Sequence, residues 1–266
     1  MAGTQLVDAY APPEIAGRVR DVGVTKARLD SVTMFVLAVL AGAFIALGAL
    51  FFTVVVTGPT GGFGTTRLLG GVAFSLGLIL VVVAGAELFT GNNLVAMAWA
   101  SRLISGRDLI RNWIVVYVGN AVGALGTVLL VWAADVASLG RGAVGDTALT
   151  IASTKARLGI VEALALGILC NALVCLAVWL ALAGRSVTDK VLAIVFPITG
   201  FVAIGFEHSI ANLFFLPYGL VLDGFVSDYL ISGALTNLAA VTVGNIIGGS
   251  LLVAGVYWVA YLRPQR

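Results

Sequence analysis

Long apolar segments dominate this chain and limit its fold more than any other feature does. A helix needs about 20 consecutive apolar residues to cross a hydrocarbon core of ~30 Å. Four segments meet this requirement without interruption: Val32–Val56, Trp113–Ala134, Leu158–Ala183 and Leu238–Leu262. Only 11% of the residues are charged and 60% are hydrophobic, whereas soluble domains average about 25% charged residues. The sequence therefore predicts an all-α integral membrane protein.

Two further apolar stretches carry polar residues in their interiors. Leu68–Ser101 and Val191–Leu222 are each too long for a single straight crossing. Their interiors hold these polar residues: Glu87, Thr90, Asn92, Glu207 and His208. Irregular backbone at membrane depth is tolerated only where it is buried in protein or lines a cavity. We therefore expect two broken helices, the second and the fifth of six spans, in a pore domain of residues 32–262.

Basic residues set the expected orientation, because cytoplasmic loops of membrane proteins carry an excess of Lys and Arg. With both termini in the cytoplasm, most of the fifteen basic residues fall in cytoplasmic segments. Four remain outside: Arg67, Arg141, Lys155 and Arg157. We expect a multi-pass protein of the cell (inner) membrane, with an outer loop at 135–157 and a cytoplasmic tail at 263–266.

The N-terminal segment, residues 1–31, lacks the apolar core of a signal peptide. Pro12 and Pro13 are typical of a helix start, and Ile15, Val19 and Val22 then fall on one stripe. We expect a cytoplasmic amphipathic helix that lies against the membrane or a neighbouring subunit.

The two interrupted stretches contain the same motif, GxExxxxN, at Gly85–Asn92 and at Gly205–Asn212, 120 residues apart. A second shared motif, VGNxxG, follows each of them in the next span. The chain therefore divides into two three-helix halves, about 32–134 and 158–262. Because three is odd, the halves must be inserted in opposite orientations, as in the inverted repeats of many transporters. By this symmetry the two breaks should meet near the middle of the membrane.

Residues that both halves share are interpreted as architecture. The glycines of VGNxxG suit close helix packing, and its asparagine is expected to bond backbone groups freed by the break, with substrate contact as the alternative. The glutamate of GxExxxxN is expected to accept backbone N–H groups where a half-helix begins, with a proton relay as the alternative. The expected structural residues are Glu87, Glu207, Asn92, Asn212, Asn120 and Asn245.

His208 has no counterpart in the first half, where Leu88 occupies the matching position. An ionisable residue inside a membrane is a functional candidate by default, and a satisfied core imidazole is the alternative. Thr90, near the other break, is expected to bond the same ligand, to cap the following half-helix, or to do both. Lys155 either attracts anions toward the pore or extends its charge to the membrane surface.

Four longer motifs resemble the formate/nitrite transporter family, from about residue 24 onward: AELFTGN (86–92), GILCNALVCLAVWLA (167–181), GFEHSIAN (205–212) and VGNIIGGSLLVAGVYW (243–258). Members of that family are six-helix, aquaporin-like protomers that assemble as homopentamers with one pore in each protomer. The resemblance implies polar pore residues His208, Thr90, Lys155 and Asn171, the last two near an outer vestibule, and apolar constrictions at Leu78, Leu88 and Phe201.

Residues and resemblance together predict a channel or transporter for small monovalent anions in the lipid bilayer. Formate is the first choice of substrate, nitrite the second and hydrosulfide the third, carried as the anion or its neutral acid with proton coupling at His208. A water channel of aquaporin type is a remote alternative, because the sequence has no Asn-Pro-Ala motif. We expect no enzyme activity, since one histidine without a partnered nucleophile is poor catalytic machinery. No cofactor, metal or nucleic-acid partner is expected.

Overall fold

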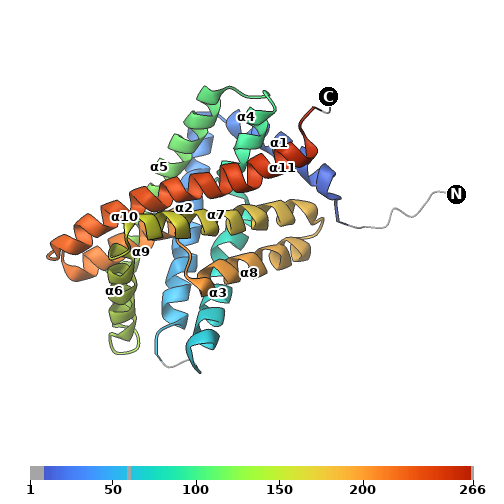
Figure 1. The fold of residues 1–266 in the computed structure, drawn as a ribbon. Helices are drawn as coiled ribbons and strands as arrows, with labels where there is room; N and C mark the ends of the chain where they lie inside the picture. Colours follow the sequence, from blue (N-terminus) through green and yellow to red (C-terminus); the bar gives the residue numbers. More distant parts are fainter. Residues whose placement is uncertain (1–8, 59–60, 265–266) are drawn as a thin grey trace.

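The computed structural model describes residues 9–58 and 61–264 of the chain. Within these ranges, six helical segments are long and apolar enough to cross a membrane. They are α2 (Ser31–Val55), α3 with η1 (Phe63–Gly85), α5 (Gly106–Ala133), α7 (Ile160–Ala183), α8 (Val187–Ile204) and α10 with η4 and α11 (Asp228–Tyr261). Figure 1 shows the helical architecture, and the prediction of an all-α protein with six spans is confirmed.

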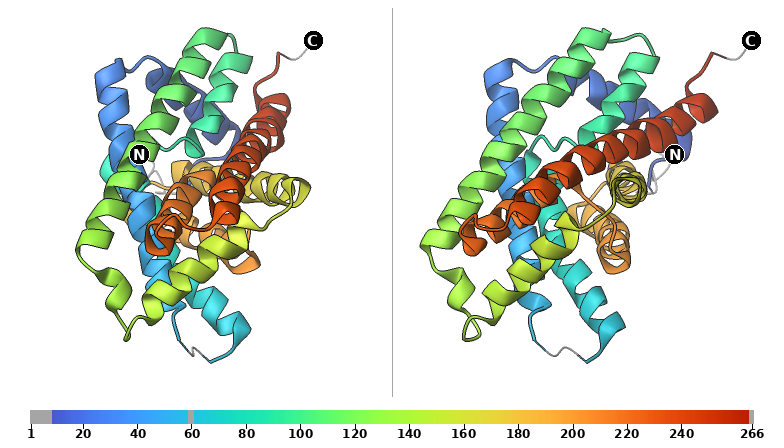
Figure 2. Two further views of the ribbon diagram at one scale, coloured as in Figure 1. Left: turned by 90° about the vertical axis from the view of Figure 1, so that its left-hand side faces the viewer. Right: turned by 60° about the vertical axis from the view of Figure 1, so that its left-hand side comes forward.

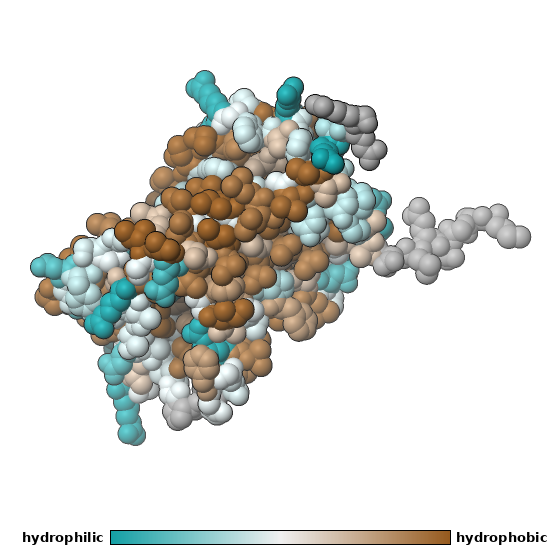
Figure 3. Space-filling view, viewed as in Figure 1, coloured by the Kyte–Doolittle hydropathy of each residue, from teal (hydrophilic) through white to brown (hydrophobic). Residues whose placement is uncertain are grey.

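Apolar side chains cover much of the surface between the two ends of the molecule. In Figure 3, hydrophobic residues form a broad area across the middle, and hydrophilic ones gather toward the ends. Large apolar side chains such as Leu130, Val161 and Phe196 are more than 70% exposed. Contiguous apolar surface of this extent marks contact with a membrane or with protein partners.

In each half, the first and third spans pack against each other through glycines. Only a residue without a side chain lets the two backbones approach this closely. A Cβ on Gly123 of α5 would collide with the carbonyl of Val39 in α2. A Cβ on Gly248 would collide in the same way with the carbonyl of Ile168 in α7. The group α2, α3 and α5 crosses the group α7, α8 and α10 (Figure 1), and the chain from α10 to α11 runs through the molecule from end to end (Figure 2).

The second and fifth spans are broken, as predicted. The second ends in a short π-helical stretch, η1 (Leu80–Gly85), and resumes as η2 (Gly91–Val95) and α4 (Ala96–Ala100). The fifth ends with α8 and resumes as α9 (Ser209–Asp223). Each break begins at a glycine in the left-handed region, Gly85 with φ +85° and Gly205 with φ +91°.

Two shorter helices lie at opposite ends of the molecule (Figure 1). The first, α1 (Pro12–Ala27), confirms the predicted N-terminal helix, but it buries Ile15 and Val19 in a cluster with α4, α7 and the π-helical η4 (Ile247–Gly255) of its own chain. The expectation that this stripe faces the membrane or another subunit is therefore wrong.

The second short helix, α6 (Ala143–Ala156), lies in the stretch that was expected to be a loop. That expectation is wrong because α6 is too short to cross a membrane and has no long apolar run, so a count of spans passes over it. We call the two ends of the molecule the α1 side and the α6 side. The C-terminal helix α11 (Val256–Tyr261) packs against α1, so both ends of the described chain lie on the α1 side.

Candidate functional site

One asparagine from a neighbouring span holds the first break. The Asn120 side chain donates from Nδ2 to the carbonyls of Ala38 (2.7 Å) and Glu87 (2.9 Å) and accepts at Oδ1 the N–H of Phe89 (2.9 Å). Glu87 and Phe89 lie in the break, where backbone groups lose their helical partners, whereas Ala38 lies inside α2. The amide therefore ties the interrupted backbone to α2.

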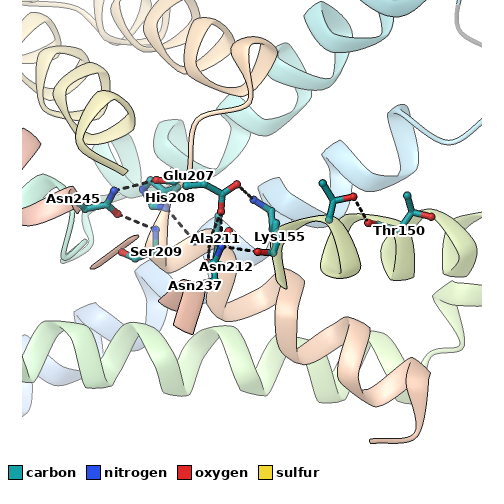
Figure 4. Close-up of polar contacts among 10 residues, drawn as sticks. Thr150, Lys155, Glu207, His208, Ser209, Ala211, Asn212, Asn237 and Asn245 are labelled. Atoms are coloured by element: carbon teal, nitrogen blue, oxygen red, sulfur yellow. Dashed lines mark hydrogen bonds and ion pairs between the residues drawn. The ribbon is translucent and has the colours of Figure 1, made fainter. Parts of the chain in front are cut away.

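Asn245 does the same at the second break (Figure 4). Its Nδ2 donates to the carbonyls of Gly167 (2.8 Å) and Glu207 (3.0 Å), and its Oδ1 accepts the N–H of Ser209 (2.9 Å). The three bonds match those of Asn120 group by group. The two breaks are thus built on one plan.

The glutamate at each break accepts from side chains, and not from backbone N–H groups as expected. Glu87 bonds Lys26 Nζ of α1 (2.6 Å) through Oε1 and Asn92 Nδ2 (2.6 Å) through Oε2. Asn92 also donates to Asn112 Oδ1 (3.1 Å). A lysine ammonium reaches each carboxylate and stabilises it more than a neutral N–H group would, because charge-assisted hydrogen bonds are the stronger ones.

The second cluster repeats this arrangement at the α6 side (Figure 4). Glu207 bonds Lys155 Nζ (2.7 Å) through Oε1 and Asn212 Nδ2 (2.7 Å) through Oε2. Asn212 donates to Asn237 Oδ1 (2.7 Å), and Asn237 donates to Glu207 Oε2 (3.2 Å). Because the Lys155 side chain is only 15% exposed and ion-paired, the alternative in which its charge extends to the membrane surface is wrong.

Sequence reasoning missed Lys26, Asn112 and Asn237, although a signal for the lysines was present. The five residues Thr25–Leu29 and Thr154–Leu158 both read TKARL, 129 residues apart. They are the last turns of α1 and α6 with the residues that follow. The repeat therefore includes a short helix before each three-span half.

His208 and Thr90 meet between the two breaks, and both are buried. His208 Nδ1 accepts the N–H of Ala211 (3.0 Å) in the first turn of α9, and Nε2 lies 3.0 Å from Thr90 Oγ1. Since Nδ1 accepts a backbone N–H, a neutral ring carries its proton on Nε2 and donates it to Thr90. His208, and not Thr90, thus caps a half-helix, because the Thr90 side chain makes no cap bond.

A cavity of about 530 Å³ lies between α6 and the second break. Lys155, Glu207, His208 and Phe201 line it, and the Phe201 ring stacks on the imidazole at 5.9 Å between centroids. At the α1 side, the space beside Lys26 measures only about 30 Å³, because α1 itself forms one of its walls. The cavity that His208 lines therefore lies on the α6 side.

Not all of the predicted pore residues line this cavity. Leu78 and Leu88 are each 2% exposed and lie in the packed core outside its lining. Asn171 was expected near an outer vestibule, but it lies deep in α7, where its amide donates to the carbonyls of Thr90 (3.2 Å) and Asn245 (2.7 Å). The expected position near an outer vestibule is therefore wrong. Asn171 links the first break to α10, whose Asn245 bonds the backbone of the second break.

The described residues do not form a metal site or an exposed thiol. In the part of the chain that the structure describes, no group of three or more His, Cys, Asp or Glu side chains could hold a metal ion. Cys170 and Cys175 are free thiols, and both are buried. The arrangement is suited to a small solute that exchanges hydrogen bonds with the imidazole and the hydroxyl.

Similar proteins share this architecture along nearly the whole chain. The sequence profile described as "Formate/nitrite transporter" matches residues 13–259. The chain is 43% identical to the formate channel FocA of Escherichia coli (strain K12), over 97% of this chain and 96% of that protein. It is 42% identical to a probable formate transporter of Methanothermobacter thermautotrophicus, over 86% and 89%.

Solved structures agree with the sequence matches. A pentameric formate channel with formate bound superposes with a TM-score of 0.81 at 41% identity, over 88% of this chain and 98% of that chain. An FNT family ion channel superposes with a TM-score of 0.83 at 28% identity, over 94% and 99%. The duplicated breaks, the buried histidine between them and these matches lead to one conclusion: the chain belongs to the formate/nitrite transporter family.

Proposed function

We propose that this protein is a channel for formate and related small monovalent anions, with one pore in each protomer. The observation that carries the proposal is the His208–Thr90 pair at the inner end of a cavity that starts beside α6. The names of the relatives and of the superposed pentameric channel support formate as the substrate and a homopentamer as the assembly. Nitrite is the second substrate, since it is also a small bent oxyanion.

An anion that crosses from the cavity has to pass apolar groups near the histidine. Phe201 lies against the imidazole, and Leu78 and Leu88 lie in the core beyond; we assign these three side chains to the constrictions. A bare charge loses hydration there at a high cost. Passage therefore requires either a donor at the centre or conversion to the neutral acid.

His208 supplies that donor in its neutral form. A second proton on Nδ1 would set two donors against each other at the Ala211 N–H. It would also place positive charge at the N-terminus of α9, where the helix dipole opposes it. We therefore expect Nε2–H to turn from Thr90 to an oxygen of the anion, and Thr90 Oγ1–H to bond the second oxygen. A proton that travels with the anion then comes from water in the cavity.

The proposal extends to the orientation of the protein in the membrane and to the absence of enzyme activity. Both termini face the cytoplasm of a cell (inner) membrane, since most basic residues then lie inside. The α6 side faces outward. We expect transport and no enzyme activity, because the His208–Thr90 pair has no nucleophile activated for covalent chemistry.

Formate flux into proteoliposomes containing His208→Phe tests the proposal. We expect a loss of about 10- to 100-fold, because a hydrogen bond to a charged group contributes about 1.5–3 kcal/mol. Ile194→Phe, which adds a ring at a buried core residue outside both the cavity and the constrictions, is the matched control for ring volume. Unchanged flux with unchanged pH dependence in His208→Phe would contradict the role of the histidine. Competition among formate, nitrite and hydrosulfide in the wild type ranks the substrates.

A further inference from the structure

Arg67 of α3 reaches the same cavity as Lys155 and His208 from a different element. Its Nε donates to the carbonyl of Ala203 (2.9 Å) in the last turn of α8. A Cβ on Gly205 would lie 2.6 Å from Nη2, so the missing side chain at Gly205 leaves the space that the guanidinium occupies. The arginine is thus held across the start of the second break.

Charge in the cavity is unevenly compensated. Besides His208, four ionisable side chains line it: Arg67, Lys155, Glu162 and Glu207. Lys155 and Glu207 form an ion pair at 2.7 Å, whereas Glu162 is exposed at the start of α7, where water and salt screen its charge. Among the residues that the structure describes, Arg67 has no ion pair, and its Nη1 and Nη2 donate no hydrogen bond. Arg67 is therefore the cation of the cavity whose charge is left without a contacting carboxylate.

We propose that Arg67 is the anion-capture residue of this cavity and that it selects planar anions with two oxygen atoms. Its Nε anchors the side chain, and the two Nη groups form a fork that matches a carboxylate or nitrite with two parallel hydrogen bonds. The anion binds there before it reaches His208. The inference rests on the proposed function and adds a binding step to it.

A purely structural role for Arg67 predicts a different effect of its substitution on flux. If Arg67 served only to cap the Ala203 carbonyl, its loss would lower the stability of the protein and the maximal flux alike, from either side of the membrane. A capture site instead changes the apparent KM, from the α6 side only, and its effect weakens as salt screens the charge.

Initial formate uptake into right-side-out and everted membrane vesicles tests the proposal with the full-length protein, at low and at high ionic strength. For Arg67→Gln we expect an increase in KM of about 3- to 10-fold for entry from the α6 side at low ionic strength, because a single charge contributes no more than the lower end of the roughly 10- to 10³-fold by which charged clefts concentrate ions. The increase should shrink at high salt, and entry from the α1 side should keep its KM. Arg141→Gln, which removes an exposed arginine that does not line the cavity, is the matched control.

Arg67→Lys separates the fork from the charge. Lysine keeps the positive charge but presents a single ammonium, so the KM for formate and nitrite should rise while that for hydrosulfide stays near the wild-type value. Elution of each variant as the wild-type oligomer shows that it has folded.

Three results would overturn the inference: an unchanged KM in Arg67→Gln, an equal change from both sides, or equal changes for all three anions in Arg67→Lys. Absence of formate flux in the wild type would instead overturn the proposed function.

Discussion

The two helix breaks share the same set of stabilising residues, which we call the frame, and differ in the residue at the centre of each break. At each, a lysine from a short helix pairs with the glutamate of GxExxxxN, and one asparagine bonds the freed backbone. The matching central residues are Leu88 and His208, and the adjoining cavities measure about 30 and 530 Å³. Duplicated groups therefore hold the architecture together, and we propose that the groups without a counterpart carry the specific chemistry.

A finer difference lies in the lysines. Lys26 bonds both Glu87 and Asn92 Oδ1 (3.1 Å), which closes the first cluster. Lys155 bonds Glu207, whereas Asn212 Oδ1 is buried without a partner in the described part of the chain. The open cavity thus coincides with the cluster whose hydrogen bonds are incomplete.

Removing either lysine should have the largest effect on stability. Lys155→Met leaves the Glu207 carboxylate buried without its cation, and breaking a buried pair in this way costs about 3–5 kcal/mol. Lys26→Met should cost somewhat less, because the Lys26 side chain is 27% exposed against 15% for Lys155. The temperature at which the detergent-solubilised oligomer is lost measures both.

Double variants test the cause of that loss. Adding Glu207→Gln to Lys155→Met, or Glu87→Gln to Lys26→Met, removes the unpaired charge and should restore part of the stability. A Lys26→Met protein as stable as the wild type would show that the two clusters are not equivalent.

Moving the histidine tests whether the breaks can exchange functions. We expect His208→Leu to lower formate flux by about 10- to 100-fold through loss of a hydrogen bond to a charged group. Adding Leu88→His should not restore it, since Leu88, unlike His208, does not line the cavity. Restored flux in the double variant, measured in proteoliposomes, would mean that the centre is as interchangeable as the frame.

Local sequence patterns predicted most of the fold. Apolar length located the six spans, and GxExxxxN with its repeat located the breaks at Glu87 and Glu207. The helix α6 escaped because its 14 residues contain no apolar run long enough to cross a membrane. The sequence of α6 indicates a helix only when the TKARL motif that it shares with α1 is noticed.

The site was less predictable, because its partners are distant in sequence. Lys26 and Glu87 are 61 residues apart, and Thr90 and His208 are 118 apart. A helix dipole acts through backbone groups close to Glu87 and Glu207 in the chain, and it gives no sign of the distant lysines that bind them. Only the TKARL repeat links Lys26 to Lys155 before the tertiary structure is known.

Alanine substitution at the two left-handed glycines should have the smallest effect on stability of the changes considered. It compares the two breaks at a single equivalent position. At Gly85 and Gly205 alike, a side chain at positive φ costs about 1–2 kcal/mol. A Cβ on Gly85 meets no atom within 4 Å, whereas a Cβ on Gly205 meets Arg67 Nη2. Both variants should therefore lose a similar amount of thermal stability, and Gly205→Ala alone should also displace the guanidinium.

Formate uptake separates that displacement from the shared strain. Gly205→Ala should raise the apparent KM for entry from the α6 side, and Gly85→Ala should leave the KM unchanged, because a Cβ on Gly85 meets no atom within 4 Å. Adding Arg67→Gln to Gly205→Ala should give no further increase in KM, since both changes act on one guanidinium. Equal KM values in the two glycine variants would mean that the breaks differ only at His208, and that the arginine at the second break belongs to the frame.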